Sequence, residues 1–410
     1  MLRVLTLSTL FPNGAEPTLG PFVERQTLAL AGRAGVEVEV AAPVGLPPWP
    51  LSLHPHYAAR SRLPFEEQWK GLTVHRPRYR VWPKLAESRT PAAIAQALLP
   101  LLRDIRRRFP FDVVDAEFFW PDGAAAAALA RSLGVPFSIK ARGSDIHYWG
   151  RRPDTAPQVI AAGRAAGGLL AVSAAMKRDM AALGLPEERT TVHYTGIDAE
   201  RFVPVDRRSA KLAFGIEGPL IVTAGGLIPR KGQRFAIEAI ESIPEATLVL
   251  IGHGPERGDL EALARRLGVE ARVRFLGSLP HDEVPRWLGA ADVTLLPSQS
   301  EGLANVWVES LACGTPVVTT DVGGAREAIN RPEAGRLAER KPEALAAAVR
   351  ELLAEPPDQA AVRRCAEPFS WERNAEALEA HLRGIAAAQC GECPPLDPRA
   401  QAGEEAVRAA

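Results

Sequence analysis

The chain of 410 residues contains only four cysteines, too few for a disulfide framework. Two of them, Cys313 and Cys365, fall inside segments with a helical pattern. Cys390 and Cys393 form a C-x-x-C without a second pair, in a tail over residues 389–410 that is rich in Pro, Gly and Glu. We expect this tail to be disordered and the protein to occupy a reducing, cytoplasmic compartment.

A long apolar run is also missing, since no stretch reaches the length needed to span a membrane. The chain starts directly on a strand-like segment, Leu2 to Ser8, without a charged leader and an apolar region behind it. We therefore expect a protein that is neither secreted nor integral to a membrane.

An excess of charge is absent too, because Lys and Arg together number 49, as do Asp and Glu. Net charge thus gives no support to a nucleic-acid partner. The first 110 residues are more basic than the rest, with a dense run at Arg103, Arg106, Arg107 and Arg108. This run is either a solvated helix face or a peripheral contact with an anionic membrane surface, such as the inner face of the membrane.

Short apolar and β-branched runs alternate with Ala-, Leu- and Arg-rich amphipathic segments along the whole chain. This alternation is typical of α/β proteins in which helices cover parallel sheets. The expected strands are Arg3 to Thr9, Val36 to Ala41, Leu72 to Arg76, Val113 to Ala116, Phe137 to Lys140, Gly168 to Val172, Thr191 to Tyr194, Leu220 to Thr223, Thr247 to Ile251, Val273 to Leu276, Val293 to Leu296 and Val317 to Thr319.

A turn-rich stretch around Gly196 and Pro204 separates two such series, and 410 residues exceed one ordinary hydrophobic core. We expect two doubly wound, Rossmann-like domains, residues 1–198 and 199–368, followed by a helix over 369–388. Two such domains that face each other bring the carboxyl ends of both sheets to one cleft, where these sheets bind ligands.

The most informative loop follows the strand near Pro297 and carries two acidic residues, Glu301 and Glu309. A helix is expected to begin near Asn305 and to end before Gly314, with Glu301 just ahead of it and Glu309 about one turn inside. The free N–H groups of a helix N-terminus favour a diphosphate, and a carboxylate one turn inside can accept both hydroxyls of a ribose. The alternative is two solvated glutamates.

A second loop, residues 224–232, contains Gly226 and the basic pair Arg230 and Lys231. Its glycines let the backbone approach a ligand, and the basic pair suits a diphosphate leaving group. The alternative is a basic turn that caps a surface helix. The chain has no Asp-x-Asp, the pattern expected where a divalent ion holds the diphosphate, so we expect no metal.

Glu301 and Glu309 form an E-x7-E pair, preceded by Pro-Ser and followed by Ala-Cys-Gly-Thr-Pro-Val-Val and by Val322-Gly323-Gly324-x-x-Glu327. Together with residues 20–26, 120–123 and 141–146, these motifs resemble the GT4 family of retaining glycosyltransferases, which have the GT-B fold. The motifs of the first half are most similar to the branch that builds exopolysaccharides and teichuronic acids.

The resemblance implies transfer of a sugar from a nucleotide-diphosphate sugar, without a cofactor, to a hydroxyl of a glycan or lipid-linked glycan. Retention would follow from attack on the face that the diphosphate leaves, so no enzyme nucleophile is assigned. Glu309 would bind the ribose, Glu301 would lie by the donor sugar, and a loop at Gly20 would close over the phosphates. The donor would further contact Gly226, Arg230, Lys231, Gly302, Leu303 and Asn305.

The chain departs from the family pattern at three positions. Gly226 stands where many relatives carry an arginine, and Arg230 would supply that charge. Glu117 replaces a histidine near the sugar; a carboxylate there accepts hydrogen bonds but donates only when protonated. Arg142 replaces a second histidine and would suit an anionic acceptor or sugar acid, so Arg142 and Asp145 are placed on the acceptor side.

Two other functions remain open at this point. A non-catalytic subunit that binds nucleotide sugars is suggested by Glu117 and Arg142, and a nucleotide-sugar epimerase could share the architecture. Donor binding without turnover would distinguish the subunit from the transferase.

Overall fold

The computed structural model describes residues 1–17, 19–82, 87–280 and 282–391, without side-chain detail from residue 389 onward. Cys393 and most of the tail expected to be disordered lie outside these residues. Across the described ranges, no helix combines the length and the apolar character needed to cross a bilayer.

The first half of the chain forms an eight-stranded sheet in the order β10-β9-β8-β7-β1-β2-β5-β4, parallel except at β4. A short parallel pair, β3 with β6, stands beside it. The strands are β1 (Leu2–Leu7), β2 (Val36–Ala41), β3 (Val44–Leu46), β4 (Glu66–Trp69), β5 (Leu72–His75), β6 (Arg78–Arg80), β7 (Val113–Ala116), β8 (Phe137–Ala141), β9 (Gly168–Ala171) and β10 (Thr190–Val192).

Helices cover both faces of this sheet because each has one apolar side. On α3, for example, Ile94, Leu98, Leu102 and Ile105 recur at helical spacing and are all buried against the sheet. The helices are α1 (Pro21–Ala31), α2 (Pro55–Ser61), α3 (Thr90–Arg108), α4 (Ala124–Leu133), α5 (Ser144–His147), α6 (Ala156–Ala165) and α7 (Ala174–Ala182).

The second half forms a six-stranded parallel sheet in the order β13-β12-β11-β14-β15-β16. Counted from its own first strand, this order is 3-2-1-4-5-6, that of a Rossmann domain. Its strands are β11 (Leu220–Ala224), β12 (Thr247–Ile251), β13 (Val273–Gly277), β14 (Val293–Leu296), β15 (Val317–Thr320) and β16 (Gly335–Ala338). Its helices are α8 (Arg207–Ala213), α9 (Gln233–Glu241), α10 (Arg257–Arg266), α11 (Val284–Ala290), α12 (Asn305–Ala312), α13 (Ala325–Ala328), α14 (Pro342–Ala354) and α15 (Gln359–Arg364).

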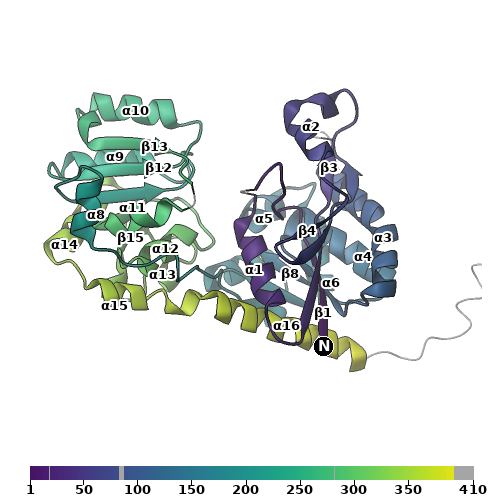
Figure 1. Ribbon diagram of the computed structural model, residues 1–410. Coiled ribbons are helices and arrows are strands. Elements are labelled where there is room, and N and C mark those ends of the chain that lie inside the picture. The colour runs from purple at the N-terminus through teal and green to yellow at the C-terminus, as the bar shows by residue number, and fades with distance from the viewer. Residues whose placement is uncertain (18, 83–86, 281, 392–410) are drawn as a thin grey trace, which may run out of the picture.

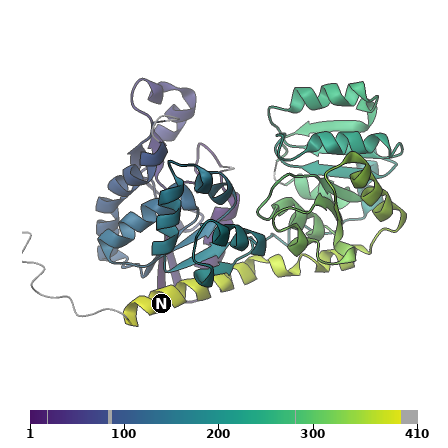
Figure 2. The ribbon, with the colours of Figure 1, turned by 180° about the vertical axis from the view of Figure 1, so that it is seen from behind.

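The last helix, α16 (Trp371–Gly391), runs along the bottom of both halves in Figures 1 and 2. Its Leu378 and Leu382 are buried with residues of β1 and β2, far away in sequence. Its Asn374 donates to the carbonyl of Tyr194 at 2.6 Å. The helix thus fastens the second half to the first. The proposed boundary at residue 198 falls between β10 and α8 and, like the other proposed domain limits, stays a prediction.

All the expected strands are present, and their ends differ from the expected ones by at most two residues. Four strands were not expected, namely β3, β4, β6 and β16. Strands β4 and β16 lie at sheet edges, where a strand does not need to be a continuous apolar run, and so the sequence pattern did not predict them. In β4, for example, every second residue is exposed. The expectation of two Rossmann-like domains is confirmed.

Candidate active site

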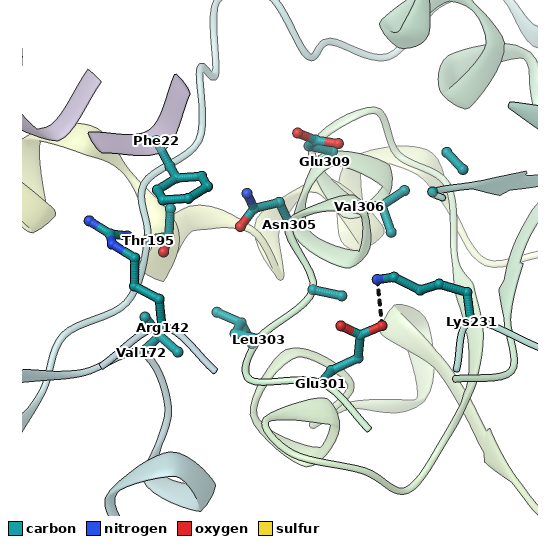
Figure 3. A pocket seen from close by; sticks show the side chains of 13 residues that line it. Phe22, Arg142, Val172, Thr195, Lys231, Glu301, Leu303, Asn305, Val306 and Glu309 are labelled. Atoms are coloured by element: carbon teal, nitrogen blue, oxygen red, sulfur yellow. Dashed lines mark hydrogen bonds and ion pairs between the residues drawn. The ribbon is translucent and has the colours of Figure 1, made fainter. Parts of the chain in front are cut away.

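A cavity of about 400 Å³ lies between the two domains, at the carboxyl ends of their strands. Both domains supply its lining, as Figure 3 shows. The lining residues are Phe22, Arg142, Val172, Thr195, Ala224, Gly225, Lys231, Glu301, Leu303, Ala304, Asn305, Val306 and Glu309. The predicted donor loops therefore meet at one place, as the topology of the sheets requires.

The N-terminus of α12 opens into this cavity. The helix begins at Asn305, as expected, and its N-cap residue Ala304 has no side chain that could accept from the first N–H groups. Ala304, Asn305 and Val306 all line the cavity. The positive end of the helix dipole is thus offered to a ligand, an arrangement suited to an anion such as a diphosphate.

Glu301 lies just ahead of α12 and is almost fully buried. Its carboxylate accepts from Lys231 Nζ at 2.6 Å and from Ser298 Oγ at 2.7 Å. The pair of Glu301 and Lys231 is marked in Figure 3. Glu301 therefore fixes the ammonium group of Lys231 inside the cavity, where it can meet a phosphate.

Glu309 lies one turn inside α12, and its half-buried carboxyl group lines the same cavity. Asn305 and Val306 lie between Glu309 and Glu301 in Figure 3. Burial raises the pKa of Glu309 to about 7, while the charges of Arg25 and Arg201 pull it downward. The two glutamates of the E-x7-E pair thus have different environments: one is held in an ion pair, and the other titrates near neutral pH.

Only some residues of the loop after β11 line the cavity. Lys231 and Gly225 line it, whereas Gly226 is exposed beside it and accepts from Gln233 Nε2 at 2.9 Å. Arg230 is about half-exposed, donates to the carbonyl of Ser300 at 2.8 Å and stays 3.5 Å from Glu301. Arg230 and Gly226 therefore lie at the rim rather than in the lining.

The opposite wall is formed by Arg142, whose guanidinium lies over the ring of Phe22 at 4.5 Å. Arg142 Nε donates to the carbonyl of Glu117 at 2.9 Å, and its terminal nitrogen pairs with the Glu117 carboxylate. Glu117 is buried behind Arg142 and also accepts from Gln26 Nε2. Two of the three positions that depart from the family pattern, Glu117 and Arg142, thus form one ion pair.

A buried polar network continues behind this wall. Lys140 Nζ donates to Gln26 Oε1 at 2.6 Å and lies 2.8 Å from His193 Nδ1. Burial lowers the pKa of Lys140 and His193, and it raises the pKa of Asp115, which also lies near the Glu117 charge. Gln26 therefore links the wall of the cavity to the interior of the domain.

Three other predicted residues, Asp145, Gly20 and Gly302, are not among those that line the cavity. Asp145 is fully buried and accepts from the N–H groups of Phe119, Arg142 and Gly143, so it shapes the loop that carries Arg142. Gly20 begins α1 with φ of 50°, and Gly302 packs against the first domain, where a Cβ would meet Val172.

Sequence reasoning missed several contributors. Phe22, Val172 and Thr195 line the cavity, and Phe22 lies in the motif at residues 20–26 that could have indicated it. Glu327, part of the quoted Gly-Gly-x-x-Glu motif, reaches across to the first domain. It accepts from the N–H groups of Ala174 and Ala175, which begin α7, and from the hydroxyl of Tyr194 at 2.8 Å.

Two facing Rossmann-like domains, with a phosphate-compatible helix N-terminus in the cavity between them, have the architecture of the GT-B fold. Comparison with known proteins agrees. Residues 205–367 match the family model described as "Glycosyl transferases group 1", and residues 23–201 match "Glycosyltransferase Family 4". The chain belongs to glycosyltransferase family 4.

Among similar proteins is a Bacillus subtilis protein named as a teichuronic acid biosynthesis glycosyltransferase, 29% identical over 85% of this chain and 88% of that one. A D-inositol 3-phosphate glycosyltransferase of Geodermatophilus obscurus is 30% identical over 77% of this chain and 76% of its own length. The solved structure of Anabaena HepE with UDP has a TM-score of 0.71 at 19% identity and covers 94% of this chain and all of that one. The expected enzyme class and fold are thus confirmed.

Proposed function

We propose that this glycosyltransferase moves a sugar, with retention of configuration and without a metal ion, from a nucleotide-diphosphate sugar to a glycan or lipid-linked glycan. We place the reaction in the cytoplasm, in the synthesis of a cell-surface polysaccharide. The observation that carries the proposal is a single cavity that combines the uncapped N-terminus of α12, the ammonium group of Lys231 and the half-buried carboxyl group of Glu309.

The diphosphate would lie against α12 and Lys231. Its charge builds up as the bond to the sugar breaks, so donors already in place stabilise the transition state more than the ground state. Backbone N–H groups near Leu303 and Asn305 would add further donors, and Arg230 at the rim would contribute a charge that solvent screens. Protein groups then supply the positive charge that a divalent ion would otherwise bring.

The nucleoside would lie toward Glu309, whose carboxylate would accept the two hydroxyls of the ribose. The donor sugar would lie near Glu301 and Leu303, facing Arg142 across the cavity. In this placement the departing phosphate takes up the proton of the acceptor hydroxyl, and the enzyme orients both partners. Water is excluded as the two domains enclose the sugar.

Incubation of the purified protein with UDP-, GDP- and ADP-sugars, with and without glycan acceptors, tests the proposal through nucleotide release. UDP is the first choice because HepE, of the same fold, was solved with it. We expect release to depend on acceptor and to survive EDTA. Release that is lost in EDTA and restored by magnesium would contradict the metal-free scheme, and donor binding without release for every acceptor would favour a non-catalytic subunit.

Variants separate the two glutamates. We expect Glu309→Ala to weaken nucleotide binding, whereas Glu301→Gln mainly lowers turnover because Lys231 loses its anchoring charge. Glu343→Gln, on an exposed position of α14, is the matched control. Equal kinetics in all three variants would remove the assignment.

A peripheral location at the membrane is also part of the proposal, but the basic run on α3 is poorly suited to provide it. Arg108 pairs with Glu39 at 2.7 Å, and Arg106 donates to the carbonyl of Leu133. Arg107 pairs with Asp104 on the same helix. These contacts favour a solvated helix face.

A further inference from the structure

A segment of the first domain exposes large apolar side chains far from the cavity. We call residues 47–65 the tip; it contains α2 and projects from the top of the first domain in Figure 1 and, seen from behind, in Figure 2. Trp49 is 78% exposed, Leu53 66% and Phe65 71%, and Leu51 is exposed beside them. Several large apolar side chains that are exposed within one short segment indicate an interaction surface.

The charged residues within the tip all have one sign. From Val44 to Phe65 the sequence contains no Asp or Glu, while Arg62 is exposed within the tip and Arg80 on the adjacent β6. Arg78, also on β6, lies over the ring of Phe65 at 4.6 Å and so brings the strand against the tip.

Two of the nearest acidic side chains are paired with arginine: Glu16 with Arg60 at 2.7 Å and Glu67 with the buried Arg76. Glu66 contacts His75 at 3.0 Å, but its side chain is 60% exposed at the edge of the tip. The exposed surface of the tip therefore combines apolar side chains with two exposed arginines, Arg62 and Arg80, and one exposed carboxylate.

We infer that the tip inserts its apolar side chains into the interface of a bilayer that contains anionic lipid. Trp, Phe and Leu beside basic residues form the combination that enters the boundary between headgroups and acyl chains. A second copy of the chain fits less well, because a symmetric contact through the same patch would oppose Arg62 and Arg80 with their own equivalents. An anionic lipid surface satisfies the apolar and the basic groups together.

The tip and the acceptor side of the cavity both follow the carboxyl ends of strands in the first domain. The tip follows β2 and β3, whereas Glu117 follows β7 and Arg142 follows β8. Docking through the tip would hold this wall of the cleft near the membrane surface and present a lipid-linked acceptor to it. Lipid binding would account for the proposed peripheral location, whereas the presentation of an acceptor rests on the proposed sugar transfer.

Sedimentation of the full-length protein with vesicles tests the inference. Vesicles of phosphatidylcholine alone are compared with vesicles that contain equal parts of phosphatidylglycerol, at low and high salt. We expect binding to the anionic vesicles that weakens as salt rises. The combined variant Trp49→Ser, Leu53→Ser, Phe65→Ser should lose about tenfold or more in lipid affinity, because each side chain contributes its own buried apolar area.

Two controls isolate the tip. Leu212→Ser removes a leucine of similar exposure from α8 in the second domain and should leave lipid binding unchanged. Arg62→Glu with Arg80→Glu should abolish the preference for anionic vesicles while keeping the apolar side chains. Nucleotide affinity, which should match that of the wild type in every variant, verifies that each one is folded.

The inference is overturned if the triple variant binds vesicles as the wild type does, or if the wild type does not bind them. Sedimentation velocity without lipid tests whether the tip binds a second copy of the chain instead. If the wild type forms a dimer that the triple variant does not form, and the wild type does not bind vesicles, the tip is a dimer interface. None of these measurements needs sugar transfer, so failure of the proposed reaction and failure of lipid binding are distinguishable.

Discussion

Glu309 should make nucleotide binding dependent on pH near neutrality. Its pKa is raised to about 7 by burial, so the carboxyl group of the free protein is mostly ionised at pH 8 and mostly protonated at pH 6. Only the carboxylate accepts from both ribose hydroxyls with full strength, because a protonated carboxyl group uses one oxygen as a donor. Nucleotide affinity should therefore fall as the pH is lowered.

The size of the effect follows from the ionised fraction. With a pKa of about 7, roughly nine tenths of Glu309 is ionised at pH 8 and just under one tenth at pH 6, so the apparent Kd should rise by up to about tenfold. Calorimetric titration with UDP, or with whichever nucleotide the panel identifies, at constant ionic strength measures this change. Uridine, or the corresponding nucleoside, serves as a second ligand because it has no phosphate that titrates in this range.

Glu309→Gln is the variant that isolates the cause. It should bind more weakly than the wild type at pH 8 and lose the additional pH dependence, and the nucleoside should reveal this without interference from phosphate. An identical pH profile in the two proteins would refute the assignment of Glu309 to the ribose.

The same pKa shift predicts a stability effect of opposite sense. The folded protein binds the proton of Glu309 more tightly than the unfolded chain, whose carboxyl group titrates near 4.5. The resulting penalty is absent below about pH 4.5, grows as the pH rises and is complete above about pH 7. Glu309→Gln should thus raise the free energy of unfolding at pH 8, by up to about 3 kcal/mol, while it weakens binding.

Two further substitutions test how the domains are held and shaped. Glu327→Ala removes the acceptor for the N–H groups at the start of α7 and for Tyr194, and should lower the free energy of unfolding by about 1–3 kcal/mol in urea titrations; an unchanged midpoint would deny that Glu327 joins the domains energetically. Gly20→Ala places a Cβ 2.1 Å from the carbonyl oxygen of Leu10, in a residue whose φ is 50°. This should lower the free energy of unfolding by about 1–3 kcal/mol and reduce turnover by displacing Phe22. The control Gly258→Ala, on α10 with open space around it, should not lower the free energy of unfolding measurably. Equal thermal stability of the two alanine variants would contradict the steric argument.

The sequence was sufficient for the elements whose pattern is local. The buried strands are continuous apolar runs, and the start of α12 and its end before Gly314 follow from the loop and glycine that flank it. Lys231, Glu301, Leu303, Asn305 and Glu309 all reach the cavity because they lie on the loops and the helix that follow parallel strands.

Contacts between segments that are far apart in the sequence could not be predicted from the sequence pattern. Arg230 and Lys231 are adjacent in sequence, yet only the second lines the cavity, because the first is drawn outward to the carbonyl of Ser300. Asp145 seemed a candidate for the acceptor side, but its oxygens are taken up by backbone N–H groups of its own loop and of Phe119. Glu327 was visible in a motif, while its partners lie in the other domain.

The ion pair between Glu117 and Arg142 explains why both residues differ from the family pattern together. A carboxylate buried at Glu117 without a partner, or a guanidinium at Arg142 without one, would cost about 3–5 kcal/mol, so neither replacement is tolerable alone. Together they neutralise each other, and Gln26 satisfies the remaining oxygen. Arg142 then presents to the cavity a guanidinium whose charge is largely balanced from behind. Its planar edge can still donate hydrogen bonds, to neutral hydroxyls as well as to a carboxylate.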